Sequence, residues 1–270
     1  MIRIYLLNRQ ELEHISCSEE IFSEDRKEKI RRLKREEDKQ RSACAELLLI
    51  YALKKHQGSI ELPLPIRCDE RRKLCLMDSA WHFNLSHTKD YAVCAISDAP
   101  VGVDIESFKV REILYPEKIL HPEEARLMAY ISNSNEKKKY FYQCWVAKES
   151  YLKNLGIGLI VRPSDFMVDE EMLKIGNTGI SDRKGNHRPS VPAADLASAR
   201  SADGAKDTSL QDNLALLEQR YVHVLEPGEV RGTDWKFDAG YKLAVCSMEK
   251  DPDLQARLIH AADVQAALES

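Results

Sequence analysis

The chain has few of the features that mark membrane, secreted or zinc proteins. Its 270 residues contain no run of 18 apolar residues, and the start MIRIYLLNRQ lacks the apolar core of a signal peptide. The seven cysteines are odd in number and form no CxxC pair, and the eight histidines form no HExxH motif. We therefore expect a cytoplasmic protein with reduced, buried cysteines, no zinc site and no membrane partner.

Excess positive charge is also absent from the chain as a whole. Forty Lys and Arg stand against 44 Asp and Glu, for a formal net charge of -4, which argues against a protein that coats nucleic acid. The exception is the stretch 25–41, with nine basic and five acidic residues. A solvated helix face is the common explanation, and a dock for anionic groups is the alternative. Arg41 lies four residues before Ala45, so it extends an apolar stripe and can reach inward.

Hydrophobic periodicity predicts an α+β fold. The predicted strands are MIRIYLL, YAVCAIS, VGVDIE, DFMVDEEMLKI, YVHVLEP and WKFDAGYKLAVCSME, and the predicted helices are CAELLLIYALKKHQG, HPEEARLMAYIS and NEKKKYFYQCWVAKESYLKNLG. Gly58 and Gly156 are expected to end the first and last of these helices, and Asn135 to cap the last one. The segment ELPLPIRCDERRKLCLM, broken by two prolines, is expected to be loop with short extended pieces.

Composition divides the chain into an N-terminal half, 1–100, a C-terminal half, 101–250, and a helical tail, 251–270. A stretch at about 176–213 is rich in Gly, Pro, Ser, Ala and Asp and has no aromatic residue, which predicts a mobile insertion. YAVCAIS and LAVCSME, one in each half, share an Ala-Val-Cys core. This short match hints at two similar α+β halves related by a pseudo-twofold.

Two acids lie close together in VGVDIES. Strand alternation places Gly102, Asp104 and Glu106 on one face, with roughly 6 to 7 Å between like-facing positions. Either a solvated strand edge or a cation between the two carboxylates would account for the pair.

The segment WVAKESYLK offers partners for these acids. On a helix, Trp145, Glu149 and Lys153 share one face. An exposed Glu149–Lys153 pair, worth about 0.3 to 0.5 kcal/mol, is the ordinary explanation. If Glu149 instead meets the strand acids, three carboxylates form an oxygen site suited to Mg²⁺, with Lys153 facing the phosphates of a ligand. Gly102 would then leave room for a bulky ligand.

A third cluster, FNLSH, ends in Ser86 and His87. Adjacency alone does not make these two a serine-hydrolase pair, because nucleophile and base need facing geometry and a third, orienting group. A polar loop that contacts phosphate and a simple turn with a satisfied histidine are the two readings that remain.

Together the three clusters resemble the 4′-phosphopantetheinyl transferases, specifically their long, surfactin-type branch. GVDIE at 102–106, WVAKESYLK at 145–153 and FNLSH at 83–87 carry the resemblance, which extends to about residue 248 apart from the insertion. It implies a pseudodimer of two α/β halves, monomeric as a chain, with the active site in the cleft between them. It also implies an enzyme of the holo-[acyl-carrier-protein] synthase type that is Mg²⁺-dependent. Such an enzyme transfers 4′-phosphopantetheine from coenzyme A to a serine of an apo acyl or peptidyl carrier protein and releases 3′,5′-ADP.

The resemblance also implies roles for individual residues. Mg²⁺ would be held by Asp104, Glu106 and Glu149, with Glu149 or a water that it orients as general base and Lys153 at the departing phosphate. Contacts to the coenzyme A phosphates are expected from Arg26, Lys29, Arg41, Lys73, Ser86 and His87. Arg26 stands where the family more often has lysine, and Lys73 lacks the glycine and proline of the corresponding family motif.

Two other functions stay open on the residues alone. A metal-dependent phosphohydrolase acting on coenzyme A or nucleotides also needs clustered acids and a lysine. A binding module that uses 25–41 for nucleic acid would show steeply salt-dependent binding. The negative net charge and the acids of the helix motif count against the latter.

Overall fold

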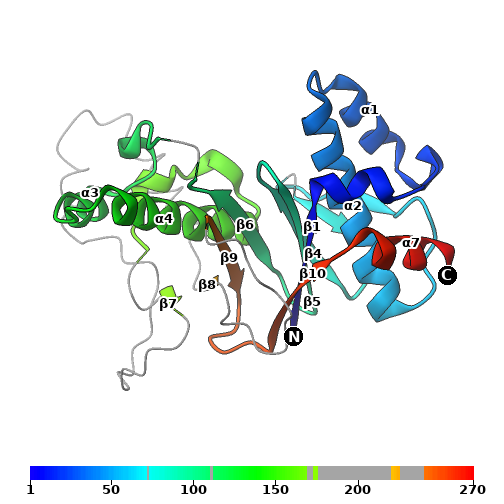
Figure 1. The fold of residues 1–270 in the computed structure, drawn as a ribbon. Helices are drawn as coiled ribbons and strands as arrows, with labels where there is room; N and C mark the ends of the chain where they lie inside the picture. The colour runs from blue at the N-terminus through cyan, green and yellow to red at the C-terminus, as the bar shows by residue number, and fades with distance from the viewer. Residues whose placement is uncertain (72, 110–111, 169–172, 176–219, 226–239) are drawn as a thin grey trace.

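Two four-stranded sheets lie next to each other, and each carries one long helix (Figure 1). The computed structural model describes residues 1–270 except 72, 110–111, 169–172, 176–219 and 226–239. The mixture of helices and sheets confirms the predicted α+β class. The insertion predicted at about 176–213 lies outside the described residues.

The first sheet has the strand order β10-β1-β5-β4. Its antiparallel part pairs β5 with β1 on one side and with β4 on the other, and β10 joins β1 in parallel. The strand bounds are β1 (Ile2–Asn8), β4 (His82–His87), β5 (Tyr91–Ser97) and β10 (Leu254–Ile259). The helix on this sheet is α2 (Glu36–Gln57), which ends as predicted at Gly58, where φ is +80°.

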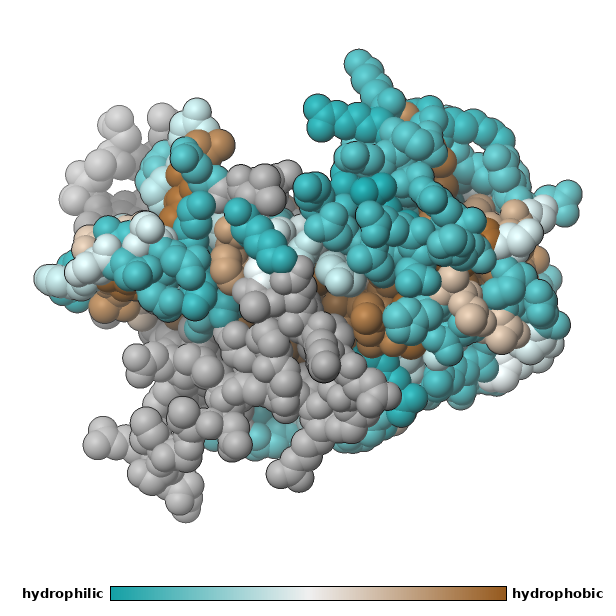
Figure 2. Space-filling model, viewed as in Figure 1, coloured by the Kyte–Doolittle hydropathy of each residue, from teal (hydrophilic) through white to brown (hydrophobic). Residues whose placement is uncertain are grey.

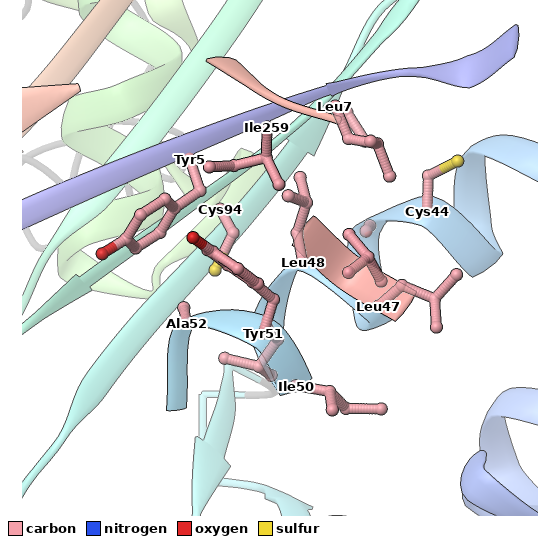
Figure 3. Packing of buried hydrophobic residues seen from close by; sticks show 14 of the residues in the cluster. Tyr5, Leu7, Cys44, Leu47, Leu48, Ile50, Tyr51, Ala52, Cys94 and Ile259 are labelled. Atoms are coloured by element: carbon pink, nitrogen blue, oxygen red, sulfur yellow. The ribbon is translucent and has the colours of Figure 1, made fainter. Parts of the chain in front are cut away.

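The core of this half lies between α2 and the sheet, as Figure 3 shows. Leu47 and Leu48 of α2 belong to one cluster with Leu7 of β1 and Ile259 of β10, and all four side chains are buried. An apolar helix face and the apolar face of a sheet each need such a cover to leave water.

The second sheet has the order β6-β9-β8-β7, with β6 (Gly102–Ser107), β7 (Leu173–Ile175), β8 (Tyr221–Leu225) and β9 (Tyr241–Ser247). The helix α4 (Ser134–Leu155) packs on it. Gly156 ends α4 with φ of +69°, as predicted. The predicted cap was wrong by two positions, because Asn133 accepts hydrogen bonds from the backbone of Asn135 and Glu136.

The two sheets share an order of elements. In the first sheet, the 22-residue helix α2 follows β1, and β5 lies between β1 and β4, antiparallel to both. In the second sheet, the 22-residue helix α4 follows β6, and β9 lies between β6 and β8, antiparallel to both. Strand β10 is an addition to the first sheet that has no counterpart in this order among the described strands. The Ala-Val-Cys segments occupy that central position, on β5 and β9. The pseudo-twofold relation itself stays a prediction.

Smaller elements surround the sheets. The helices are α1 (Glu24–Arg32), α3 (Pro122–Ala129) and α7 (Ala261–Glu269), and β2 (Ile66–Cys68) pairs with β3 (Leu74–Leu76) in the segment predicted as loop with short extended pieces. Short 3₁₀ helices are η1 (Arg9–His14), η2 (Glu19–Ile21), η3 (Pro116–Lys118), η4 (Gly158–Ile160) and η5 (Pro163–Asp165). The surface over α1 and the start of α2 is mostly hydrophilic (Figure 2). Across the described ranges, no helix is both long and apolar enough to cross a membrane.

Two segments differ from the sequence predictions. The tail predicted to be helical begins with strand β10, which places Ala256 in one apolar cluster and Ile259 in another before α7 starts. FNLSH, predicted to be loop or turn, is strand β4 and pairs along its whole length with β5. Strand β10 takes its backbone hydrogen bonds from β1, far away in the sequence, and β4 takes them from β5 across a short turn, so neither strand is stabilised by its own local pattern alone.

Candidate active site

A pocket of about 330 Å³ opens where β4, β6 and α4 meet. It gathers side chains from all three sequence motifs: Leu85, Ser86 and His87 of β4, Asp104 and Glu106 of β6, and Trp145, Glu149 and Lys153 of α4. The structure therefore brings together both predicted catalytic residues, all three predicted metal ligands, and Ser86 and His87.

A closed polar network crosses this pocket. The Lys153 ammonium lies 2.6 Å from Asp104 Oδ1 and donates a hydrogen bond of 3.0 Å to Ser86 Oγ. Ser86 in turn donates to the same Asp104 oxygen at 2.7 Å. Lys153 thus has its ion pair with the strand acid, across elements, rather than the exposed pair with Glu149 that helix spacing alone would favour.

The second oxygen of Asp104 has no partner. Asp104 is buried, and its Oδ2 atom is shielded from solvent without a hydrogen bond. A buried carboxylate oxygen without a donor is costly, so this atom marks a position where a cation or a proton donor would be stabilised.

The surroundings of Glu149 make its carboxylate a better proton acceptor. Its pKa is raised, first by burial and then by the negative charge of Asp104, while Lys153 acts in the opposite direction. A carboxylate whose pKa has moved up towards neutrality accepts a proton more readily than an ordinary glutamate does. The predicted general base therefore lies in a site that favours that role.

The three predicted carboxylate ligands do not converge on a single metal position in this structure. Among the residues that the structure describes, no three His, Cys, Asp or Glu side chains converge closely enough to hold an ion. Asp104, Glu106 and Glu149 nonetheless line one pocket, and Asp104 Oδ2 is unpartnered. This set of oxygen donors fits Mg²⁺, which takes only one or two carboxylates when phosphate oxygens and water complete its shell.

Positive charge gathers around His87, which lines the pocket. His87 keeps an exposed surface, and its pKa is lowered, first by partial burial of its ring and then by Arg41, Lys153 and Lys29. Arg41 pairs with Asp38 and also donates to the carbonyl of Lys89 at 3.5 Å. An imidazole close to three cations is a suitable place for phosphate.

Two predicted phosphate-binding residues have other partners. The buried guanidinium of Arg26 pairs with Glu46 and donates to Ser42 Oγ at 3.2 Å, so it joins α1 to α2 and does not line the pocket. The Lys73 ammonium donates to the carbonyls of Asn154 at 2.8 Å and Val101 at 3.2 Å. Burial lowers the pKa of Lys73 to about 8.

Gly102 has a different role from the one that its place on the acid face suggests. A Cβ atom there would lie 2.5 Å from the backbone N of Asn154, and closer still to the carbonyl oxygen of Ser150. The space in front of Gly102 is therefore filled by the backbone of α4 and is no passage for a ligand. The glycine lets helix and strand approach closely enough for Glu149 and Lys153 to meet Asp104.

Sequence reasoning missed a buried ion pair beside the site. The Lys148 ammonium is fully buried and forms an ion pair with Glu124. It also donates hydrogen bonds of 2.8 Å to the carbonyls of Ile119 and Pro163. Glu124 also accepts from the backbone N of Val168 at 2.9 Å. The signal was present, because Lys148 interrupts the apolar face of α4, where an unpaired charge would be unfavourable.

Comparison with known proteins agrees with this geometry. The family model of the 4′-phosphopantetheinyl transferase superfamily matches residues 100–186, a range that holds the acids of β6 and the motif of α4. Ser86 and His87 lie outside the matched range.

Individual relatives carry the same name. The chain is 32% identical over 150 residues to a 4′-phosphopantetheinyl transferase of Bacillus subtilis, covering 54% of this chain and 65% of the relative. It is 29% identical over 149 residues to 4′-phosphopantetheinyl transferase Sfp of Bacillus subtilis strain 168 (54% and 66%). It is 36% identical over 89 residues to 4′-phosphopantetheinyl transferase gsp of Aneurinibacillus migulanus (33% and 37%). The matches thus span less than two thirds of each of these relatives. Residues 100–186 thus match the 4′-phosphopantetheinyl transferase superfamily, and the similarity to these relatives supports the Sfp-like, surfactin-type branch that the motifs predict.

Proposed function

We propose that this protein transfers the 4′-phosphopantetheine group of coenzyme A to a serine hydroxyl of an apo acyl or peptidyl carrier protein, with Mg²⁺, and releases 3′,5′-ADP. One observation carries the proposal: a single pocket joins a carboxylate of raised pKa, Glu149, to the Lys153–Asp104–Ser86 network. The names of the relatives support the transfer reaction, and the residues supply its chemistry.

The reaction is a displacement at phosphorus. The serine oxygen of the carrier forms a bond to the β-phosphorus of coenzyme A, the phosphorus that bears pantetheine. The bond from that phosphorus to the bridging oxygen breaks, and this oxygen leaves with 3′,5′-ADP. Glu149 takes the proton of the serine hydroxyl, and Lys153 offsets the charge that develops on the leaving phosphate.

Asp104, Glu106 and Glu149 would hold Mg²⁺ in this pocket. When bound, the ion neutralises pyrophosphate charge during the displacement. The unpartnered Oδ2 of Asp104 is the atom of this chain that most needs such a cation. Lys153 bonds to the other oxygen of Asp104, so its ammonium would lie beside a bound metal ion and could also contact the substrate phosphates.

The cations around His87 would receive the phosphates of coenzyme A. Ser86 and His87 line the pocket, and Lys29 and Arg41 are close enough to affect the pKa of His87. Arg26 and Lys73 would reach the substrate only by giving up the bonds that hold them to α2 and α4. We therefore assign them a supporting role in the proposed site, in place of the direct contacts that the resemblance implies.

Intact mass spectrometry of the acceptor tests the proposal. A panel of apo acyl and peptidyl carrier proteins is incubated with the protein, coenzyme A and Mg²⁺, and each carrier is weighed. We expect a mass gain of one phosphopantetheine group on the reactive serine of at least one carrier, and none when the metal is removed with a chelator.

Matched variants connect the result to the site. Glu149→Gln is expected to abolish the mass gain, whereas Glu136→Gln, in the exposed first turn of the same helix, is expected to leave it intact. A protein that splits coenzyme A without labelling any carrier would be a phosphohydrolase, and that result would overturn the transferase proposal.

A further inference from the structure

Three polar contacts join the first sheet to the second beside the pocket. The side-chain oxygen of Asn84 accepts from the backbone N of Val103 at 2.8 Å, and Ser86 donates to Asp104. Beyond them, the Tyr241 hydroxyl of β9 donates to a carboxylate oxygen of Asp90, in the turn between β4 and β5. Of these contacts, the Ser86–Asp104 bond joins two residues that line the pocket, whereas Tyr241 and Asp90 are not among the lining residues.

The Tyr241 side chain is held firmly in place. It is buried, and its ring meets that of Tyr91 edge to face with centroids 5.2 Å apart. The Lys109 ammonium lies 5.7 Å from the ring centroid on β9. In the sheet, Tyr241 pairs with Ser107, the residue after Glu106, so its backbone lies one position along the strands from the carboxylate wall of the pocket, which Asp104 and Glu106 form.

Asp90 is linked through its turn to β4, the strand that contributes Ser86 and His87 to the pocket. Its carbonyl accepts from the backbone N of Arg9 at 2.7 Å, and the turn is closed by a bond of 2.8 Å from the Thr88 N to the Tyr91 carbonyl. His87 is the last residue of β4, three positions before Asp90. A pull on the Asp90 side chain is therefore transmitted through a short, hydrogen-bonded turn to His87.

We infer that Tyr241 and Asp90 are positioning residues: their hydrogen bond fixes His87 opposite the carboxylate wall and thereby sets the affinity for the phosphate-bearing substrate. The inference rests on the proposed function. It requires no contact between Tyr241 and the substrate, because the hydroxyl acts through Asp90 and the turn. No assigned catalytic, metal or phosphate role includes either residue.

Steady-state kinetics of four variants test it. Tyr241→Phe and Asp90→Ala remove the bond, and we expect each to raise the KM for coenzyme A about five- to tenfold while kcat stays within about twofold. Asp90→Asn keeps an acceptor oxygen for the tyrosine and should restore a wild-type KM. Tyr5→Phe is the matched control, since it removes another tyrosine hydroxyl that bonds to His56 in the first core. It should leave the KM unchanged.

An NMR titration of His87 in the free protein gives a readout that does not depend on transfer. The resonance is assigned by its loss in His87→Gln. In Tyr241→Phe and Asp90→Ala we expect the pKa of His87 to rise towards that of an ordinary histidine, because a released ring loses its partial burial and moves away from Arg41, Lys153 and Lys29. Asp90→Asn should match the wild type.

The outcomes separate the two proposals. An unchanged KM and an unchanged His87 titration in Tyr241→Phe would overturn the positioning role, even in a protein that transfers phosphopantetheine. Loss of stability in Tyr241→Phe with the same KM would show a purely structural bond and would also overturn it. If no carrier is labelled by the wild type, the proposed function fails, and the His87 titration still decides whether the turn is held by Tyr241.

Discussion

Replacement of Gly102 by alanine separates two explanations of the same glycine. Space for a ligand, the interpretation suggested by the sequence, predicts a stable protein with a raised KM. The structure predicts a different result, because the new methyl group would meet the backbone of α4 at Ser150 and Asn154. Backbone atoms cannot rotate away as a flexible side chain can.

The size of the effect follows from the contact distances. A Cβ at 2.5 Å from Asn154 N must recede by about 1 Å to reach an ordinary contact, so α4 has to move from β6 by a similar amount. Overpacking of this kind costs about 1 to 3 kcal/mol in the free energy of unfolding. A shift of about 1 Å of Glu149 and Lys153 relative to Asp104 would lower kcat about 100-fold.

Urea unfolding followed by circular dichroism, together with the carrier mass assay, measures both effects. Gly58→Ala is the matched control, because no atom lies within 4 Å of its Cβ position and only its φ of +80° makes the substitution unfavourable. It should cost stability at the end of α2 and leave kcat unchanged. A Gly102→Ala protein with wild-type stability and kcat would refute the close-packing argument.

Three further predictions concern charged groups. Lys148→Met leaves Glu124 charged and buried without its ammonium partner, so it should lower the free energy of unfolding by about 3 to 5 kcal/mol in urea titrations. A loss below about 1 kcal/mol would contradict the importance of the pair. Since the pKa of Glu149 is raised on folding, the wild type should lose stability as pH increases from the ordinary glutamate value through the raised one. Glu149→Gln should not show this decline while its transfer rate falls at least about 100-fold, and parallel pH curves for the two proteins would exclude the shift. Lys153→Met removes the ammonium from Asp104, so Mn²⁺ should bind the free protein at least about tenfold more tightly, as measured by electron paramagnetic resonance. Unchanged Mn²⁺ affinity would show that Lys153 and the metal ion do not compete for Asp104.

Most elements could be predicted from the sequence where local pattern decides the structure. Near-continuous apolar runs gave β5 and β9, and glycines in the left-handed region ended α2 and α4. Strand β4 was missed because its alternate residues Asn84 and Ser86 are polar, although they face the second sheet and bond to it. Strand β10 was missed because its partner β1 lies about 250 residues away.

The residues of the candidate site were predictable from the sequence, but their partners were not. Asp104, Glu149 and Lys153 come from patterns that each show a shared face, and the fold brings those faces together in one pocket. Which partner a cation selects was not predictable. Arg26 pairs with Glu46 on a separate helix, and no periodicity within either segment encodes that distance. Long-range contacts of this kind exist only once the chain has folded.

The parallel pairing of β10 with β1 constrains the order in which the two sheets can fold during synthesis. The N-terminal sheet needs residues 254–259 to cover the edge of its first strand, and its apolar cluster needs Ile259 and Val264. A nascent chain that has emerged only through β5 therefore carries an open strand edge and an incomplete core. The first half to leave the ribosome must wait for the last segment before it can close, so the second sheet is free to form before the first is complete.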